Sequence, residues 1–296
     1  MAKRPGPVLV TGANSGIGLA SVLRLAQRGW DVHGTVRSAA KADELRAAAE
    51  EAKCAANVHP FVLDVSDHDA VVDAWPNLPD FYAVVNNAGY SETGAIEEVS
   101  AARAKAQLDV NLIAPAVIAS LALPAMRRAG AGRIVNISSI AGRATIMPLN
   151  GWYHASKFGL EALSDVLRVE VAAFGVKVVL VEPGFFKTKI GERTRNKTDA
   201  AHAGSPYAKA YERVAAGLDL VERFAPPPDA VARTITSAIE SARPRPRYLV
   251  GVDALATAAT VPWLPREVTD LAMRVGGGLF AASSSRASSA KERERR

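Results

Sequence analysis

Cysteine is almost absent from this sequence of 296 residues, in which Cys54 is the only one. A single cysteine excludes an internal disulfide and fits a reducing compartment. Metal-ligand spacing is absent as well, because the five histidines are scattered along the chain. We therefore expect surface or packing roles, and no metal site, for His33, His59, His68, His154 and His202.

Long apolar runs are lacking too. The most apolar segment, residues 110–126, is interrupted by Asn111, Pro115, Ser120 and Pro124, whereas a membrane-spanning helix needs about 20 predominantly apolar residues. This segment predicts a buried helix instead. The opening residues, MAKRPGPVLV, carry charge without the apolar stretch of a signal peptide. We expect a cytoplasmic protein.

The body of the chain has no strong charge of either sign. The formal net charge is +6, and half of it comes from residues 281–296, a basic tail that we expect to be disordered. Basic residues interleaved with aromatic ones are missing, so nucleic acid is not an expected partner. Binding of a membrane surface or nucleic acid through the tail stays an alternative.

Short apolar segments alternate with helical patterns along most of the chain. This alternation predicts a parallel sheet with helices on both faces, a doubly wound α/β domain of about seven strands over residues 1–280. Residues 186–226 break the alternation. The expected strands are 7–10, 31–36, 60–65, 82–89, 132–138, 176–184 and 247–251, and the expected helices include 39–53, 67–75, two within 95–129, 152–174 and 229–241.

A glycine-rich turn, TGANSGIG, follows the first expected strand and places Gly12, Gly16 and Gly18 before a helix. Glycine lets the backbone turn tightly and approach a pyrophosphate, and the helix N-terminus offers N–H groups to phosphates. The Gly-Lys-Ser/Thr sequence of nucleoside-triphosphate loops is missing. The turn therefore predicts a dinucleotide site.

Further motifs follow in order. They are NNAG at residues 86–89, Asn111 in DVNL, Ser139 in IVNISS, Tyr153 and Lys157 in YHASK, and Pro183, Gly184 and Thr188. Together with the glycine turn, they resemble the short-chain dehydrogenases/reductases over residues 8–190. The stretch VEPGFF resembles retinol- and steroid-active members. The resemblance implies a Rossmann-type oxidoreductase acting on a carbonyl or alcohol, and assembly into dimers or tetramers.

Tyr153 and Lys157 stand one helical turn apart, which brings a phenol close to an ammonium. A phenol has a pKa near ~10, and a neighbouring ammonium lowers it. We therefore expect Tyr153 to be the general acid in reduction and the base in oxidation. Ser139 is expected to donate to the substrate oxygen. The resemblance implies that Lys157 also bonds the nicotinamide ribose and that Asn111 holds a water connecting Lys157 to solvent.

The serine assignment carries one departure from the family. Ser139 and Tyr153 are fourteen positions apart, one more than the family spacing. Either the loop RATIMPLNGW holds an extra residue or the assignment is wrong, with Ser138 as the farther choice. A serine at a strand end can also simply bond its own turn.

Cofactor choice depends on the end of the second strand, where Val36, Arg37 and Ser38 include no carboxylate. An acidic residue there bonds the ribose of NAD, whereas an arginine accommodates the 2′-phosphate of NADP. Arg37 therefore favours NADP(H) over NAD(H). The expected cofactor-binding residues are Gly12, Asn14, Ser15, Gly16, Ile17, Gly18, Arg37, Ser38, Asp64, Val65, Asn87, Ala88, Gly89, Tyr153, Lys157, Pro183, Gly184 and Thr188.

Residues 186–226 occupy the substrate-lid position that the resemblance implies, and their first part is basic. A pocket lined by Met147, Leu149, Trp152, Phe185 and Phe186 favours a hydrophobic alcohol or ketone. Helix 152–174 has apolar residues on two sides, which predicts a homodimer or homotetramer. The alternative to an enzyme is a catalytically silent sensor or regulator that binds NADP(H).

Overall fold

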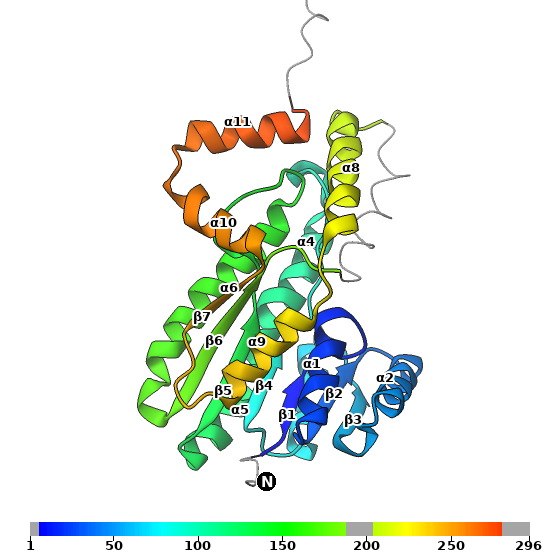
Figure 1. The fold of residues 1–296 in the computed structure, drawn as a ribbon, viewed down its shortest axis with the longest axis vertical. Coiled ribbons are helices and arrows are strands. Elements are labelled where there is room, and N and C mark those ends of the chain that lie inside the picture. The colour runs from blue at the N-terminus through cyan, green and yellow to red at the C-terminus, as the bar shows by residue number, and fades with distance from the viewer. Residues whose placement is uncertain (1–5, 188–203, 280–296) are drawn as a thin grey trace, which may run out of the picture.

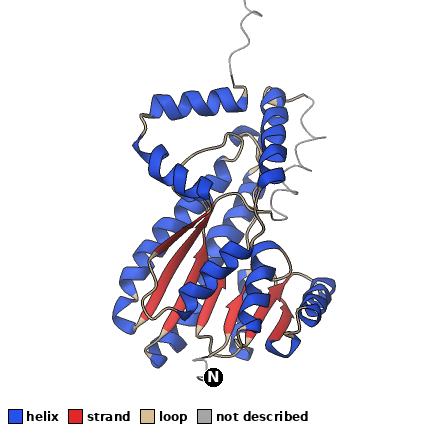
Figure 2. Cartoon of the chain, in the orientation of Figure 1, coloured by secondary structure: helices blue, strands red, loops and turns tan. Residues whose placement is uncertain are grey.

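The computed structural model describes residues 6–187 and 204–279. They contain a seven-stranded sheet that is parallel throughout and has the order β3-β2-β1-β4-β5-β6-β7, as Figures 1 and 2 show. The predicted fold class is confirmed. The strands are β1 (Val8–Val10), β2 (Val32–Val36), β3 (Val58–Val62), β4 (Ala83–Asn86), β5 (Gly132–Ile137), β6 (Val176–Pro183) and β7 (Arg247–Val250).

Two layers of helices cover the sheet, one on each face. Successive residues of a strand point to opposite faces, so each strand contributes side chains to both cores. Within β1, Val8 and Val10 join the core under one layer, and Leu9 joins the core under the other. Burial on both faces explains why the strands are continuous apolar runs. The first layer holds α1 (Gly16–Gln27), α2 (Ala39–Glu51) and α9 (Asp229–Glu240); the second holds α3 (His68–Ala74), α5 (Ala114–Ala129) and α6 (Gly151–Glu170).

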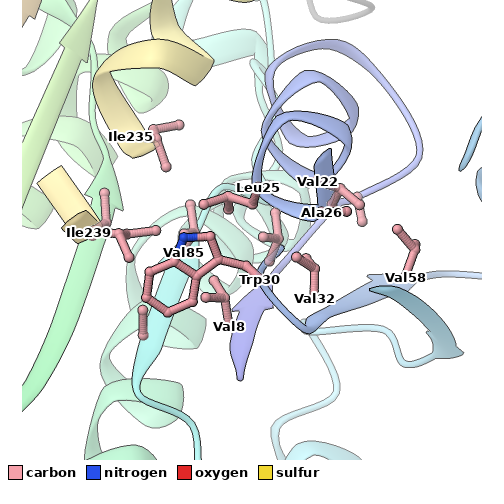
Figure 3. Packing of buried hydrophobic residues seen from close by; sticks show 14 of the residues in the cluster. Val8, Val22, Leu25, Ala26, Trp30, Val32, Val58, Val85, Ile235 and Ile239 are labelled. Atoms are coloured by element: carbon pink, nitrogen blue, oxygen red, sulfur yellow. The ribbon is translucent and has the colours of Figure 1, made fainter. Parts of the chain in front are cut away.

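Trp30 is a large side chain of the first core and is almost fully buried. Figure 3 shows its ring among Val8, Leu25 and Ile239, between the sheet and helices α1 and α9. Its indole N–H donates to Glu240 over 3.1 Å, so the buried polar atom is satisfied. These contacts fix the first βα unit, and with it the glycine turn, against the rest of the molecule.

Strand β3 differs from the prediction, since it spans Val58–Val62 rather than 60–65. It lies at the edge of the sheet and pairs with β2 from Val58 onward, and an edge strand tolerates Pro60. The chain then turns at Asp64, whose carboxylate accepts from the backbone N–H of Ser66. Asp64 and Val65 therefore lie after the strand.

The expected helical region 95–129 contains α4 (Ala101–Leu108), a π-helical turn (Asp109–Ile113) and α5. By length and composition the stretch Ala101–Ala129 is long and apolar enough to cross a membrane, with a mean hydropathy of 1.7. A core helix of a soluble protein passes the same test. Here one face of α5 packs on the sheet through Ala114, Ile118, Ala119, Ala122 and Met126.

Three helices stand above the carboxyl ends of the strands (Figure 1). They are α8 (Ala208–Phe224), α10 (Val252–Thr260) and α11 (Arg266–Gly277). Helix α8 falls within the predicted lid of residues 186–226, whereas α10 and α11 have no counterpart in the predicted elements. Thr188 and the tail 281–296 lie outside the described residues.

Candidate active site

The order of the strands reverses between β1 and β4. Strands β2 and β3 lie on one side of β1, and β4 and the later strands lie on the other. Open parallel sheets bind ligands at such a switch point, outside the carboxyl ends of the strands. A cavity of about 840 Å³ lies there, which we call the main cavity. Its wall includes the predicted Gly12, Asn14, Ser15, Gly16, Ile17, Arg37, Asp64, Val65, Asn87, Ala88, Gly89, Ser139, Tyr153, Lys157, Pro183 and Gly184.

The glycine turn has the geometry that its sequence predicts. Gly12 and Gly16 adopt positive φ angles of 65° and 53°, which favour glycine. Gly18 does not line the cavity; a Cβ there would lie 2.2 Å from the Gly12 carbonyl oxygen, so it allows close packing under the turn. The first turn of α1 has no acidic residue. The turn thus fits an anionic phosphate group at the helix N-terminus.

Thr11 and Asn87 hold this turn against the exit of β4. The Thr11 hydroxyl accepts from the backbone N–H groups of Asn87 and Ala88 at 3.0 and 2.9 Å. The Asn87 side-chain amide donates to the carbonyls of Thr11 and Gly12 at 2.8 and 3.2 Å. Asn87 therefore lines the cavity and also positions the glycine turn.

The end of β2 presents two cations to the main cavity. Arg37 is exposed at the mouth, and Lys41, one helical turn further on, also lines the wall. The Lys41 ammonium pairs with Glu44 over 2.5 Å. Ser38 does not line the cavity and caps α2 instead, with its hydroxyl accepting from the Lys41 N–H. Lys41 was not predicted; its spacing from Arg37 at the start of a helix was the available signal.

Tyr153 lies in the first turns of α6, opposite the end of β5. The Ser139 hydroxyl bonds the Tyr153 hydroxyl and lowers the phenol pKa, but burial has the larger effect and raises that pKa above its ordinary value. Ser139 also accepts from the Ala141 N–H over 3.1 Å, so it bonds its own turn as well. Although Ser139 and Tyr153 are fourteen positions apart in the sequence, their side chains form a hydrogen bond in the fold.

Ser138 also lines the main cavity, and it is buried near Glu161. Burial raises the pKa of Glu161, and Ser138 acts against this rise. The loop between Ser139 and Tyr153 closes with Leu149 at a φ of 61°, a backbone conformation that is uncommon for leucine. The Leu149 carbonyl accepts from the Gly94 N–H over 2.7 Å, which holds the loop in place.

Lys157 is buried, and its ammonium donates to the Ile137 carbonyl over 2.8 Å. It lies 5.7 Å from the centre of the Tyr153 ring, over the ring face. Burial lowers the pKa of Lys157 to about 8, while Glu161 acts to raise it. The net shift of the Tyr153 pKa is thus upward, against the expected lowering, because burial outweighs the effect of the Lys157 ammonium, which faces the ring and a backbone carbonyl.

Asn111 lies in the π-helical turn between α4 and α5, a feature common at functional sites. Its amide donates to the Tyr90 carbonyl and to the Ser156 hydroxyl, at 2.9 and 3.1 Å. Its carbonyl oxygen accepts from the Tyr90 N–H over 3.1 Å. The Asn111 side chain thus fixes the wall of the main cavity to α6, one residue before Lys157.

A network of charges lies behind the site. Glu182 is fully buried at the end of β6 and pairs with Arg143 and Arg247, at 3.3 and 3.2 Å. Arg247 also pairs with Glu161 over 3.2 Å. Burial, together with the nearby Glu161 charge, raises the pKa of Glu182 to about 7. Sequence reasoning missed this network, because its members come from distant parts of the chain.

The substrate side of the main cavity is apolar. The predicted Met147, Phe185 and Phe186 line it, and so do Ile146 and Leu218, whereas Leu149 and Trp152 do not. Polar wall residues that were not predicted are Thr35, Ser66, Tyr90, Ser91, Glu92, Asn150 and His154.

The histidines are less scattered in the fold than in the sequence. Parallel pairing of β2 with β3 places His33 beside His59, and Asp31 pairs with His59 over 2.5 Å. Ligand atoms of these three residues lie within 4.8 Å of one another. They belong to the starts of β2 and β3 and do not line the main cavity.

The family model for short chain dehydrogenases matches residues 7–199. The chain belongs to the short-chain dehydrogenase/reductase family. A probable short-chain type dehydrogenase/reductase, VdlC of Helicobacter pylori, is 33% identical over 90% of this chain and 96% of its own. Rat retinol dehydrogenase 16 is 31% identical over 89% and 86%, and the 3-ketodihydrosphingosine reductase of Bacteroides thetaiotaomicron is 30% identical over 92% and 98%.

Solved structures agree with the family. A short-chain dehydrogenase from Streptomyces avermitilis has a TM-score of 0.73 and 28% identity over 95% of this chain and all of its own. A metagenomic short-chain oxidoreductase in complex with NADP has a TM-score of 0.65 and 26% identity over 83% and 96%. The chain is therefore a short-chain dehydrogenase/reductase with the family fold.

Proposed function

We propose that the protein is an NADP(H)-dependent oxidoreductase that interconverts a hydrophobic carbonyl compound and its alcohol. The observation that carries the proposal is the convergence of Ser139, Tyr153 and Lys157 on the main cavity, with Arg37 and Lys41 at its nucleotide end. The NADP-bound metagenomic relative supports the cofactor. Two cations and no carboxylate at the end of β2 suit a 2′-phosphate better than a free hydroxyl.

The nicotinamide supplies or accepts a hydride when it is bound. Tyr153 then gives a proton to the developing alkoxide, or takes one from the alcohol. Ser139, which bonds the Tyr153 hydroxyl, donates to the same substrate oxygen. Lys157 is positioned by the Ile137 carbonyl to favour negative charge on the phenol oxygen once the proton has left.

An apolar substrate is supported by the wall opposite Tyr153, which Ile146, Met147, Phe185 and Leu218 form. The names of two relatives, a retinol dehydrogenase and a 3-ketodihydrosphingosine reductase, point to the same class of compound. Burial of such side chains against an alkyl or isoprenoid group contributes binding in proportion to the apolar area removed from water.

The test is a panel of apolar ketones, aldehydes and retinoids, with NADPH consumption followed by absorbance and NADPH binding followed by titration. Turnover of at least one apolar carbonyl, with NADPH bound more tightly than NADH, is the expected result. Tight NADPH binding without turnover across the panel would favour a silent sensor. Absence of NADPH binding would overturn the proposal.

We further propose self-association through α6 and a cytoplasmic location. The outer face of α6 exposes Phe158, Ala162, Val166 and Val169, at spacings that place them on one side of the helix. A second copy of the chain would cover this face. The location is supported by the single cysteine, which is buried.

A further inference from the structure

A second cavity of about 370 Å³ adjoins the main one under the helices above the sheet. Four residues line both cavities, namely Ile146, Met147, Phe185 and Leu218, so the two meet at the apolar wall near Tyr153. We call the second cavity the apolar chamber. Its remaining wall comes from Thr145 and Pro148 in the loop before α6, from α8 and α11, and from the segment between α10 and α11. The lining residues of these helices and this segment include Val214, Gly217, Val221, Leu264, Val268, Met273 and Gly276.

The chamber wall offers little to a polar ligand. Its side chains are mostly aliphatic, and Phe185 is the only aromatic one among the described residues that line it. The guanidinium of Arg213 donates to the Val275 carbonyl over 3.1 Å, and the Thr269 hydroxyl donates to the Arg266 carbonyl over 2.9 Å. Since aliphatic side chains make up most of the wall and two of its few polar groups bond the protein backbone, the wall suits an apolar occupant.

Two glycines line the chamber at its solvent-exposed side. Gly217 lies in the middle of α8 and Gly276 in the last turn of α11, and both line the wall. A Cβ on either would meet no atom within 4 Å, and neither residue has a positive φ. Neither close packing nor backbone conformation requires glycine there, although glycine inside a helix costs about 1 kcal/mol relative to alanine. What the two glycines provide is space.

We propose that the apolar chamber holds the aliphatic chain of the substrate, and that Gly217 and Gly276 set the length of chain admitted. The reacting oxygen lies at Tyr153, and the chain passes between Met147 and Leu218 into the chamber. The substrate class is a long-chain aliphatic aldehyde, ketone or alcohol. This inference rests on the proposed function, because it takes the reaction at Tyr153 as given.

The experiment measures kcat/KM with NADPH for straight-chain aldehydes from butanal to hexadecanal. Each methylene buried in the chamber is worth about fourfold in kcat/KM, so the wild type should climb with chain length until the chamber is full. Gly217→Leu should leave butanal unchanged and lower kcat/KM for the long aldehydes at least tenfold. Gly276→Val should do the same, and neither variant weakens the helix.

Ala216→Leu is the matched control, because Ala216 is the exposed neighbour on the same helix and does not line the chamber. It should keep the wild-type profile. Equal chain-length profiles in the wild type and Gly217→Leu would overturn the inference, as would the same loss in Ala216→Leu.

Binding of a fluorescent polyene fatty alcohol separates the two proposals. If butanal is reduced but the probe binds wild type and Gly217→Leu equally, the chamber inference fails and the proposed function stands. If the probe binds the wild type at least tenfold more tightly than Gly217→Leu while no aldehyde is reduced, the chamber holds a chain and the proposed reaction fails.

Discussion

Tyr153 is held in its protonated form at neutral pH. Burial raises its pKa, and the Lys157 ammonium lies over the ring rather than beside the hydroxyl. A phenol that keeps its proton is an acid ready for use, which suits reduction of a carbonyl. The protonated phenol can therefore supply the proton that the substrate oxygen needs when a carbonyl is reduced.

Replacement of Tyr153 by phenylalanine removes the hydroxyl and keeps the ring that Lys157 faces. We expect turnover to fall by about 10²–10⁴, the usual contribution of a positioned acid. NADPH binding should change little, because the cofactor residues at β1 and β2 are untouched. Steady-state kinetics and a binding titration check both points. Near-normal turnover would remove Tyr153 from the mechanism.

Arg37 and Lys41 should contribute unequally to cofactor choice. Arg37 is exposed and forms no ion pair with another described residue, whereas Lys41 forms an ion pair with Glu44. A charge-assisted bond to the 2′-phosphate is worth about 1.5–3 kcal/mol, or roughly ten- to a hundredfold in affinity. Arg37→Ala should weaken NADPH by about that factor and leave NADH unchanged, and Lys41→Ala should have a smaller effect.

Titration of both cofactors against the wild type and the two variants makes the measurement. The Arg37 effect should shrink at high salt, because the residue is exposed. Equal loss for NADPH and NADH in Arg37→Ala would show that Arg37 supports the fold of the site rather than selecting the cofactor.

Glu182 makes stability depend on pH. Its folded-state pKa is about 7, above the ordinary value of a glutamate, so the folded protein holds a proton that the unfolded chain has lost between these values. The free energy of unfolding should therefore fall as pH rises from about 5 to 8, by up to about 3 kcal/mol from this residue. Glu182→Gln should flatten the fall, since glutamine does not titrate.

Urea unfolding of both proteins across this pH range is the measurement. Glu170→Gln, which replaces an exposed carboxylate on α6, serves as the control and should follow the wild type. Parallel pH profiles for the wild type and Glu182→Gln would mean that the buried carboxyl keeps an ordinary pKa in the folded state.

At the scale of elements, the sheet and its covering helices could be predicted because their patterns are local. A strand buried on both faces leaves a continuous apolar run, as in β6, and a glycine turn marks the start of α1. The predicted strand 60–65 begins at Pro60, whereas β3 begins at Val58, because an edge strand accepts a proline in its interior. Helices α10 and α11 have no counterpart in the prediction, although Val268, Leu271 and Val275 recur at helical spacing in α11.

The candidate site likewise has residues that local patterns predict and partners that they do not. Tyr153, Lys157 and Gly12 stand in short motifs, and the sequence therefore locates them. The contacts that position the site and the charges behind it are non-local. Ile137 bonds Lys157, Thr11 holds the exit of β4, and Arg247 pairs with Glu182. The register of the parallel strands and the packing of α6 against them bring these groups together, and spacing along the chain encodes neither.

At the scale of the whole molecule, the helices above the sheet line a cavity that meets the main cavity near Tyr153. Helices α8 and α11 contact each other above the sheet (Figure 1). The main cavity lies at the carboxyl ends of the strands, whereas the apolar chamber is lined mainly by these helices. In the proposed function, the reaction takes place in the main cavity and the apolar chamber selects the substrate. Such a separation lets one fold serve many substrates.

The outer face of α6 makes the last prediction. Val166 and Val169 are 59% and 70% exposed, and Phe158 is 41% exposed, so an apolar stripe faces away from the sheet. Burial of this stripe against a second copy would remove it from water. We expect a dimer or larger assembly at micromolar concentration by light scattering. Val166→Glu should give a monomer that still binds NADPH, because a buried unpaired charge is costly in such an interface. Ala216→Glu on α8 is the control and should leave the assembly intact. A monomeric wild type would show that α6 is not an interface.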